Sequence, residues 1–172
     1  MILRNDKIKL RAPELDDLDT IFEWENNTDI WNLSQTQLPF SRFDIEQFIL
    51  QSNHDIYIEK QFRFIIESIA EKNIVGAIDL FDFDAINKRA GVGILIDKNF
   101  RKLGIGSQAL DILIKYAKST LNLHQLYCNI LLSNLVSLHL FKKKHFQEIG
   151  VKKDWIFING KYQDEVVLQL IL

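Results

Sequence analysis

Four of the seven glycines in this 172-residue chain lie within sixteen positions, as Gly91, Gly93, Gly104 and Gly106. Elsewhere glycine is scarce, and its overall share of about 4% is below the usual value of about 7%. Glycine permits left-handed backbone and close approach by other atoms, so this crowding indicates that the segment needs unusual backbone geometry. Any fold assigned to the chain must account for it.

The composition is that of an ordinary globular domain, and it excludes several classes of protein. Hydrophobic residues make up 47%, charged residues 26%, and the formal charge of −2 argues against a general nucleic-acid binder. The single cysteine, Cys128, excludes an internal disulfide, and the four histidines lack metal-binding spacing, so we expect no metal. The N-terminus lacks a signal-peptide core, and the uncharged stretch 119–141 holds ten polar residues. We therefore expect a cytoplasmic protein with no membrane span.

Hydrophobic periodicity predicts an α/β chain in a single domain over residues 1–172. Asn159-Gly160 is typical of a type I′ hairpin turn between the last two strands. The order of elements predicts an antiparallel meander followed by a βαβ crossover, and so a mixed, mostly antiparallel sheet of about seven strands with flanking helices. Strands are predicted at 8–11, 62–68, 74–83, 89–96, 126–132, 146–158 and 162–172, and helices at 13–26, 42–52, 104–120 and 134–144.

The segment Arg101-Lys-Leu-Gly104-Ile-Gly106-Ser107 follows a predicted strand and opens a predicted helix. Glycines there let backbone N–H groups reach a ligand, and the helix dipole and two cations favour a phosphate. The run Gly104 to Ala109 also fits the dinucleotide pattern GxGxxA, which requires an acid about 20 residues on. No acid occurs between Ile112 and Gln147, and only 66 residues follow Gly106. We therefore reject the dinucleotide interpretation.

The motif Arg-x-x-Gly-x-Gly resembles the pyrophosphate-binding loop of the GNAT superfamily of acetyl-CoA-dependent N-acyltransferases. Three further segments resemble this family, in particular its branch of RimJ/RimL and spermidine N-acetyltransferases. They are Arg89–Ile96, which is similar to the fourth strand, Asn134–Phe146, which is similar to a later helix, and Trp155–Asp164, which is similar to the terminal hairpin. The resemblance covers nearly the whole chain.

This resemblance implies the acyl-CoA N-acyltransferase fold, in which the fourth and fifth strands splay apart around the pantetheine arm of acetyl-CoA. The backbone of the fourth strand would bind the pantetheine arm, and the glycine loop would bind the pyrophosphate. The later helix would lie beside the pantetheine arm. A lysine run such as Lys142–Lys144 is more often a surface feature, although Lys143 is included among the implied cofactor residues. The implied cofactor residues are Ile94, Leu95, Ile96, Arg101, Lys102, Leu103, Gly104, Ile105, Gly106, Ser107, Asn134, Ser137, Phe141 and Lys143.

The chain departs from the family where the resemblance would place catalytic groups. The family's general acid is a Tyr at the position of Phe141, which carries no proton to donate, and a Glu often found on the fourth strand falls at Gly91. The Gly expected before Phe146 is His145. An ordinary thiol pKa of about 8.5 lets CoA leave without a strong acid. Tyr127, Tyr116 or water are candidates to replace the missing acid.

Charge divides the chain in a way that bears on the acceptor. Residues 97–145 carry a net +6, which suits polyanionic CoA, whereas residues 12–41 hold seven acids and no Lys or Arg. In the related enzymes the first helices cover the acceptor side, which suggests a cationic amine such as a polyamine, although an acidic helix face is commonly just solvated. Candidate acceptor-binding residues are Glu25, Asp29, Trp31, Asp79 and Asp82.

The sequence therefore predicts an N-acetyltransferase in which an amine attacks acetyl-CoA directly in a ternary complex. Two alternatives stay open: an enzyme that acetylates protein N-termini, and a CoA-binding or regulatory module impaired by the loss of the tyrosine at position 141. Partners would be a small-molecule amine or a protein N-terminus, with no nucleic acid and no membrane. The oligomeric state is left open, a homo-oligomer included.

Overall fold

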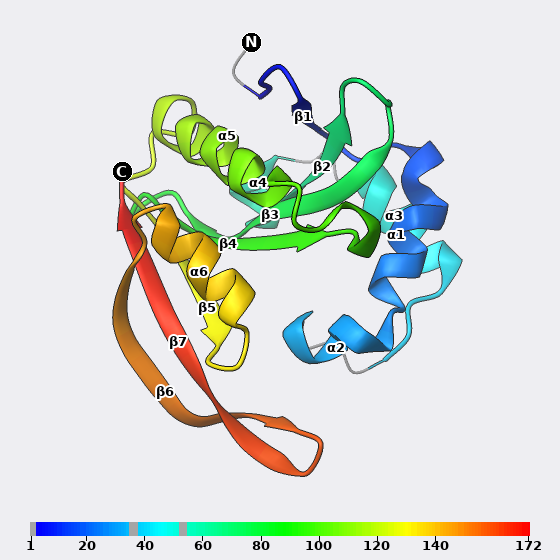
Figure 1. The fold of residues 1–172 in the computed structure, drawn as a ribbon. Helices are drawn as coiled ribbons and strands as arrows, with labels where there is room; N and C mark the ends of the chain where they lie inside the picture. The colour runs from blue at the N-terminus through cyan, green and yellow to red at the C-terminus, as the bar shows by residue number, and fades with distance from the viewer. Residues whose placement is uncertain (1–2, 35–37, 52–54) are drawn as a thin grey trace.

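A seven-stranded mixed sheet, in the order β1-β2-β3-β4-β5-β7-β6, forms the centre of the computed structural model (Figure 1). The structure describes residues 3–34, 38–51 and 55–172, without the side chains of residues 32–34. The predicted sheet is confirmed, and all neighbouring strands are antiparallel except β4 and β5. The strands are β1 (Ile8–Arg11), β2 (Phe62–Ser68), β3 (Ile74–Asp84), β4 (Arg89–Ile96), β5 (Gln125–Leu131), β6 (Gln147–Ile158) and β7 (Lys161–Ile171).

Helices cover both faces of the sheet. On one face α5 (Ile105–Ser119) and α6 (Leu135–Lys143) pack against the larger core, and on the other α1 (Leu18–Glu25) and α3 (Arg42–Gln51) cover a smaller cluster (Figure 1). Two short helices, α2 (Thr28–Ser34) and α4 (Ile56–Glu59), lie in the connection from α1 to β2. No helix among the described residues is both long and apolar enough to cross a membrane.

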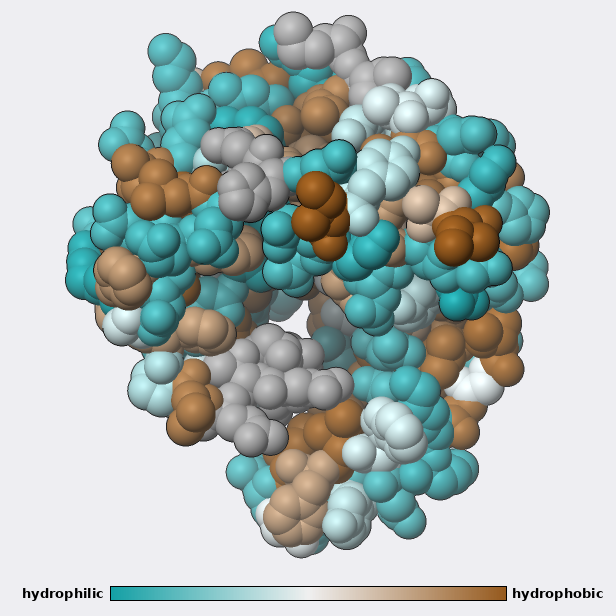
Figure 2. Space-filling view, turned by 180° about the vertical axis from the view of Figure 1, so that it is seen from behind, coloured by the Kyte–Doolittle hydropathy of each residue, from teal (hydrophilic) through white to brown (hydrophobic). Residues whose placement is uncertain are grey.

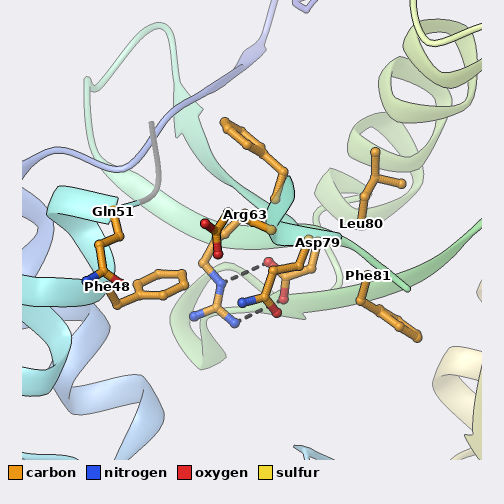
Figure 3. A pocket seen from close by; sticks show the side chains of 9 residues that line it. Phe48, Gln51, Arg63, Asp79, Leu80 and Phe81 are labelled. Atoms are coloured by element: carbon orange, nitrogen blue, oxygen red, sulfur yellow. Dashed lines mark hydrogen bonds and ion pairs between the residues drawn. The ribbon is translucent and has the colours of Figure 1, made fainter. Parts of the chain in front are cut away.

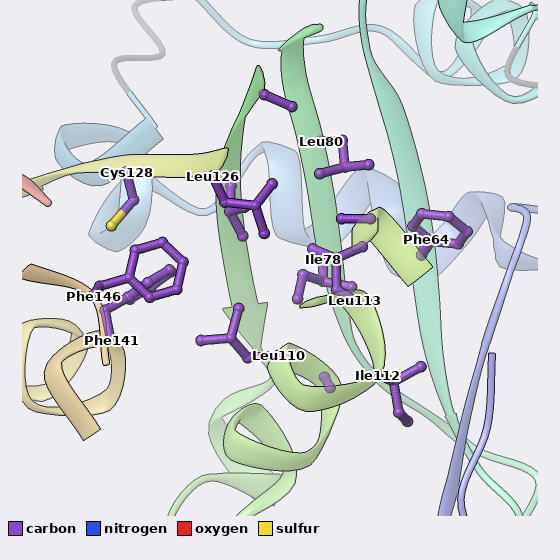
Figure 4. Packing of buried hydrophobic residues seen from close by; sticks show 14 of the residues in the cluster. Phe64, Ile78, Leu80, Leu110, Ile112, Leu113, Leu126, Cys128, Phe141 and Phe146 are labelled. Atoms are coloured by element: carbon purple, nitrogen blue, oxygen red, sulfur yellow. The ribbon is translucent and has the colours of Figure 1, made fainter. Parts of the chain in front are cut away.

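Strand β2 shows how the period of two assigns side chains to the two layers. Phe64 and Ile66 belong to the core beneath α5, whereas Ile65 between them joins Ile21 and Ile45 under α1 and α3. Figure 4 shows the larger core, where side chains from the sheet meet those of α5 and α6. Both faces of the central strands are therefore buried, which fixes their register.

Strands β4 and β5 pair over three residue pairs only, from Arg89–Gln125 to Gly91–Tyr127. Beyond Gly91, β4 continues to Ile96 while pairing with β3 alone, and β5 continues to Leu131 while pairing with β7. The predicted separation of these two parallel strands is confirmed. Among the described residues, one edge of β4 therefore has no strand partner from Val92 onward.

The two terminal strands form the hairpin that projects at the bottom of Figure 1. Asn159 and Gly160 have φ values of 50° and 78°, as the predicted type I′ turn requires. Seen from behind, polar and apolar side chains are interspersed over the surface of the molecule (Figure 2).

The prediction for the first helix was partly wrong. Residues predicted to be helical from Pro13 instead form a 3₁₀ turn, Leu15–Asp17, and α1 begins only at Leu18. The Asp17 carboxylate accepts hydrogen bonds from Arg11 and from the Glu14 backbone, which fixes a separate turn at this point. Helices α2 and α4 were not predicted, because seven and four residues are too short to show a helical period.

Candidate active site

The glycine loop leads directly into the N-terminus of α5. Gly104 is the N-cap, with a left-handed φ of 74°, and a Cβ placed on it would meet no atom within 4 Å. The Arg101 Nε donates to the Ile96 carbonyl at 3.1 Å, which ties the loop to the end of β4. The first N–H groups of a helix have no partner within the helix, and here they lie next to Arg101 and Lys102 in the chain, an arrangement that fits a phosphate.

Gly106, in the first turn of α5, serves close packing. A Cβ there would lie 3.4 Å from Leu140 Cδ2 on α6 and 3.5 Å from Ile96 Cγ1 on β4. The start of α5, the end of β4 and α6 thus lie against one another, and the predicted cofactor residues come from these three elements and the loop that precedes α5. Ile94, Leu95, Ile96, Ile105 and Ser107 are half-buried, whereas Arg101, Lys102 and Leu103 are exposed.

Asn134 and Ser137 meet at the start of α6, where Asn134 is the N-cap and its Oδ1 accepts from the Ser137 backbone N at 3.2 Å. At the other end of this helix, Lys142 and Lys144 form ion pairs with Glu148 and Asp111. Within the described part of the chain Lys143 forms no ion pair, and it is exposed. It is thus the member of the run with its charge available to an anion.

Phe141 lies in the hydrophobic core with 2% of its surface exposed (Figure 4). Its ring meets Phe146 edge-on at 5.0 Å, and the backbone N–H of Phe146 donates to the Phe141 carbonyl. His145, between them in the turn, has a left-handed φ of 67°. These are the features of a Schellman helix end, so Phe141 closes α6 by an apolar contact. Its direct contact with the cofactor stays a prediction.

On the opposite face of the sheet, Arg63 is held between two of the predicted acceptor residues. It donates to Asp79 through Nε at 2.8 Å and Nη2 at 3.0 Å (Figure 3), and it also pairs with Glu25. Burial opposes its charge, but Asp79 and Glu25 outweigh this and raise the pKa of Arg63 further above its ordinary value. Arg63 stays charged, and with its two carboxylates it forms a group of net charge −1.

Two members of this group, Arg63 and Asp79, line a pocket of about 150 Å³ with aromatic walls, which Glu59 also lines. The Phe48 ring faces the Arg63 guanidinium at 5.4 Å, and Phe81 forms part of the opposite side, whereas Leu80 points away into the core (Figure 3). Arg63 was missed at the sequence level, although an arginine inside an otherwise apolar strand was a usable signal.

The remaining predicted acceptor residues lie apart from one another. The Trp31 indole donates to the Glu25 carbonyl at 2.7 Å, which places this ring beside the ion-paired group. Asp29 is exposed in the first turn of α2. Asp82 lies at the other end of this face of the sheet, next to Tyr127.

Asp82 and Tyr127 are joined by a hydrogen bond that crosses strand β4. The Tyr127 hydroxyl on β5 donates to Asp82 Oδ2 on β3 at 2.9 Å. Both residues line a second pocket of about 590 Å³, with Asp84, Arg89, Gln125, Ile149, Val167 and Gln169. Burial and the bond to Asp82 raise the pKa of Tyr127 to about 12, so its hydroxyl stays protonated at neutral pH.

Between the two pockets, Phe81 occupies the space above Gly91. A Cβ on Gly91 would lie 2.2 Å from Phe81 Cε2, so no other residue fits at position 91 while this ring is in place. The Phe81 ring also meets Tyr127 edge-on at 5.9 Å. The position at which the family resemblance implies a fourth-strand Glu is thus filled here by an aromatic ring from β3.

Two further observations concern metal and thiol chemistry. Among the described residues no three His, Cys, Asp or Glu side chains come together as a metal site. Cys128 is buried in the larger core, and burial raises the pKa of its thiol to about 12. A protonated, inaccessible thiol is not a nucleophile.

The sequence profile of the acetyltransferase (GNAT) domain matches residues 7–147 of this chain. A spermidine N(1)-acetyltransferase of Vibrio cholerae is 30% identical over 161 residues, covering 93% of this chain and 90% of that protein. A spermidine N(1)-acetyltransferase of Escherichia coli is 27% identical over 159 residues, covering 92% and 83%.

Solved structures show the same similarity. The crystal structure of the Vibrio cholerae spermidine N-acetyltransferase in complex with CoA and spermine superposes with a TM-score of 0.87 at 29% identity, covering 97% of this chain and 96% of that one. A structure of the same enzyme with manganese ions gives a TM-score of 0.80 at 28% identity, covering 96% and 92%.

Proposed function

Since the chain belongs to the GNAT family of acetyltransferases, we propose that it transfers the acetyl group of acetyl-CoA to a cationic primary amine, and that this amine is a polyamine. The observation that carries the proposal is the Arg63–Asp79 ion pair in a pocket that Phe48, Phe81 and Glu59 also line, with Glu25 bound to the same guanidinium. An excess of carboxylates over the one guanidinium, beside aromatic rings, suits an ammonium group linked to methylene segments. The similarity to enzymes that are named for spermidine supports the same choice.

Acetyl-CoA would bind from the side of α5 and α6. The amides of α5 and the side chains of Arg101 and Lys102 would hold the pyrophosphate, and the edge of β4 without a strand partner would hold the pantetheine. The thioester would then lie where β4 and β5 separate, and the amine would approach from the Arg63 pocket. The protein's contribution in this scheme is to position the two reactants and exclude water.

A panel of amines tests the acceptor. Release of CoA from acetyl-CoA would be measured, above the background without amine, for spermidine, spermine, a neutral primary amine and a peptide with a free N-terminus. We expect kcat/KM for the polyamines to exceed the others by at least about tenfold, a difference of roughly 1.4 kcal/mol. Faster turnover of the peptide would favour the acetylation of protein N-termini. CoA binding without turnover of any amine would show an impaired CoA-binding module.

The cofactor loop is tested by a pair of matched glycines. Gly104 and Gly160 have φ values of 74° and 78°, and a Cβ on either meets nothing within 4 Å, so both glutamate variants impose the same backbone strain. In Gly104→Glu the new carboxylate would repel the pyrophosphate, and we expect the Kd for CoA, measured by calorimetry, to rise by at least about tenfold. Gly160→Glu lies on the terminal hairpin and should leave that Kd unchanged. Equal affinities in the two variants would refute the loop assignment.

A further inference from the structure

We infer that Asp82 and Tyr127 form the proton-transfer pair of the acetyl transfer. This inference rests on the proposed function. The chain lacks a hydroxyl at position 141 and a carboxylate at position 91, which are the groups that the family resemblance would use. The structure joins one hydroxyl and one carboxylate elsewhere, through the bond of 2.9 Å between Tyr127 and Asp82.

The position of Tyr127 in the sheet places the pair near the reacting atoms. Gly91–Tyr127 is the last residue pair before β4 and β5 separate, so the Tyr127 side chain starts at the closed end of the gap between the strands. The unpaired edge of β4, which would hold pantetheine, begins at the next residue. A thioester at the end of the pantetheine arm would therefore meet this side chain.

A bulge in β3 brings Asp82 to the same face of the sheet. Phe81 pairs with Gly91, and the register then shifts before Asp84 pairs with Arg89. Asp82 lies in the shift with a left-handed φ of 47°. Without the bulge, alternation would put its side chain on the face opposite Phe81, beneath α5. Bulges redirect side chains in this way beside active sites, and a left-handed non-glycine residue is retained where surrounding contacts enforce it.

Glycine at position 91 leaves the space that the Phe81 ring occupies. Gly91 is also the residue of β4 that pairs with Tyr127, and the bond from Tyr127 on β5 to Asp82 on β3 spans β4. The Phe81 ring packs against Tyr127 at 5.9 Å. Gly91 thus admits the ring that packs beside the Tyr127–Asp82 pair.

The pair can complete the reaction with all protons accounted for. The reacting ammonium first loses one proton to water. The resulting neutral amine attacks the thioester carbonyl, a C–N bond forms, the C–S bond breaks, and the sulfur leaves with the bonding electrons. Asp82 accepts the proton lost by the amine nitrogen, and Tyr127 donates its hydroxyl proton to the thiolate. Asp82 then returns its proton to the Tyr127 oxygen, so both side chains end as they began and the products are the amide and CoA thiol.

Two substitutions and two matched variants test the pair. Because general acid–base catalysis contributes about 100- to 10,000-fold, we expect Tyr127→Phe and Asp82→Asn each to lower kcat by at least about 100-fold, with the Kd for CoA unchanged. The double variant should lose no more than either single one, because the two residues act in one relay. Tyr162→Phe removes a hydroxyl from the exposed hairpin and should keep full kcat. Asp84→Asn is the control for Asp82→Asn: it also removes one carboxylate charge from this pocket, but it leaves the bond between Tyr127 and Asp82 in place.

Three results would overturn the inference. The first is retention of more than half of kcat in Tyr127→Phe or Asp82→Asn. The second is an equal loss in Asp84→Asn and Asp82→Asn, because the effect would then be pocket charge. The third is an unchanged pKa of the CoA thiol in Tyr127→Phe, which can be measured even if the wild-type protein acetylates no amine and the proposed function itself fails. A Tyr127 hydroxyl near the sulfur stabilises the thiolate, so Tyr127→Phe should raise the pKa of the thiol of bound CoA by about one pH unit. The ultraviolet absorbance of the thiolate, measured across a pH titration, gives this pKa. No change in that pKa would contradict the inference.

Discussion

At the scale of single residues, position 145 shows that a residue other than glycine can hold a left-handed helix end. His145 occupies the left-handed position that closes α6, with the flanking contact between Phe141 and Phe146 intact. A left-handed conformation costs a non-glycine residue about 1–2 kcal/mol. The chain retains the turn because the apolar contact and the helix-end hydrogen bonds hold it in place.

Replacing His145 with glycine should therefore stabilise the protein. The left-handed strain is removed, while the greater freedom of glycine in the unfolded chain returns part of the gain, so we expect a net increase of about 0.5–1 kcal/mol in the free energy of unfolding. Urea denaturation of the two proteins measures it. His139→Gly, at an exposed position inside α6, is the control and should destabilise instead, because glycine is unfavourable within a helix. Destabilisation by His145→Gly would contradict the Schellman assignment.

At the scale of elements, β3 and β4 are matched through Phe81 and Gly91. The ring on one strand fills the volume that the other strand leaves empty. Gly93, two residues along the same face, has no such neighbour, since its closest contact would be Asp79 Oδ2 at 3.8 Å. Two glycines of one strand thus differ in how much they tolerate a side chain.

Alanine substitutions should separate the two glycines. Gly91→Ala forces a methyl group into the Phe81 ring, and we expect it to lower the free energy of unfolding by about 1–3 kcal/mol, as overpacking does. Gly93→Ala should be neutral or slightly stabilising, because alanine costs less entropy in a strand. Thermal denaturation compares them. Adding Phe81→Leu to Gly91→Ala should recover part of the loss, and no recovery would show that the ring is not the cause.

Sequence reasoning performed well for the elements and less well for the contacts between them. Period-two alternation and the Asn159-Gly160 turn predicted the strands correctly, because these signals are local in the chain. The glycine loop was placed correctly at the start of a helix for the same reason. The Arg63 ion pairs and the Tyr127–Asp82 bond join residues 16 to 45 positions apart. Such pairings depend on register and on a bulge that no local pattern shows.

At the scale of the whole molecule, an ionic group fastens the first strand to the sheet. Arg11 on β1 pairs with Asp17 at 2.7 Å and with Glu67 on β2 at 2.5 Å, and Lys9 pairs with Glu67 at 2.9 Å. Although burial opposes its charge, hydrogen bonds from Arg11 and Lys9 lower the pKa of Glu67. Because the folded value lies below the unfolded one, Glu67 stabilises the protein above about pH 4.3, and the contribution is lost as pH falls further.

Substituting Glu67 by Gln should therefore reduce both stability and its dependence on pH. At pH 7 we expect a loss of about 1–3 kcal/mol in the free energy of unfolding, because two cations lose a charged partner. The difference from wild type should shrink in acid, where wild-type Glu67 is itself protonated. Urea denaturation at several pH values measures both effects. Glu71→Gln, in the exposed turn between β2 and β3, should leave the profile unchanged. A constant difference at every pH would refute the ionic explanation.

The three residue pairs that join β4 to β5 have a consequence for how the protein is assembled. The meander of β1 to β4 and the group of β5 to β7 are joined by this short β4–β5 pairing, beyond which β4 and β5 separate. A ligand that lies against the unpaired edge of β4 would supply the missing backbone hydrogen bonds, as an added strand does in peptide recognition. The co-substrate then becomes a temporary part of the architecture. Each catalytic cycle would close and reopen the middle of the sheet.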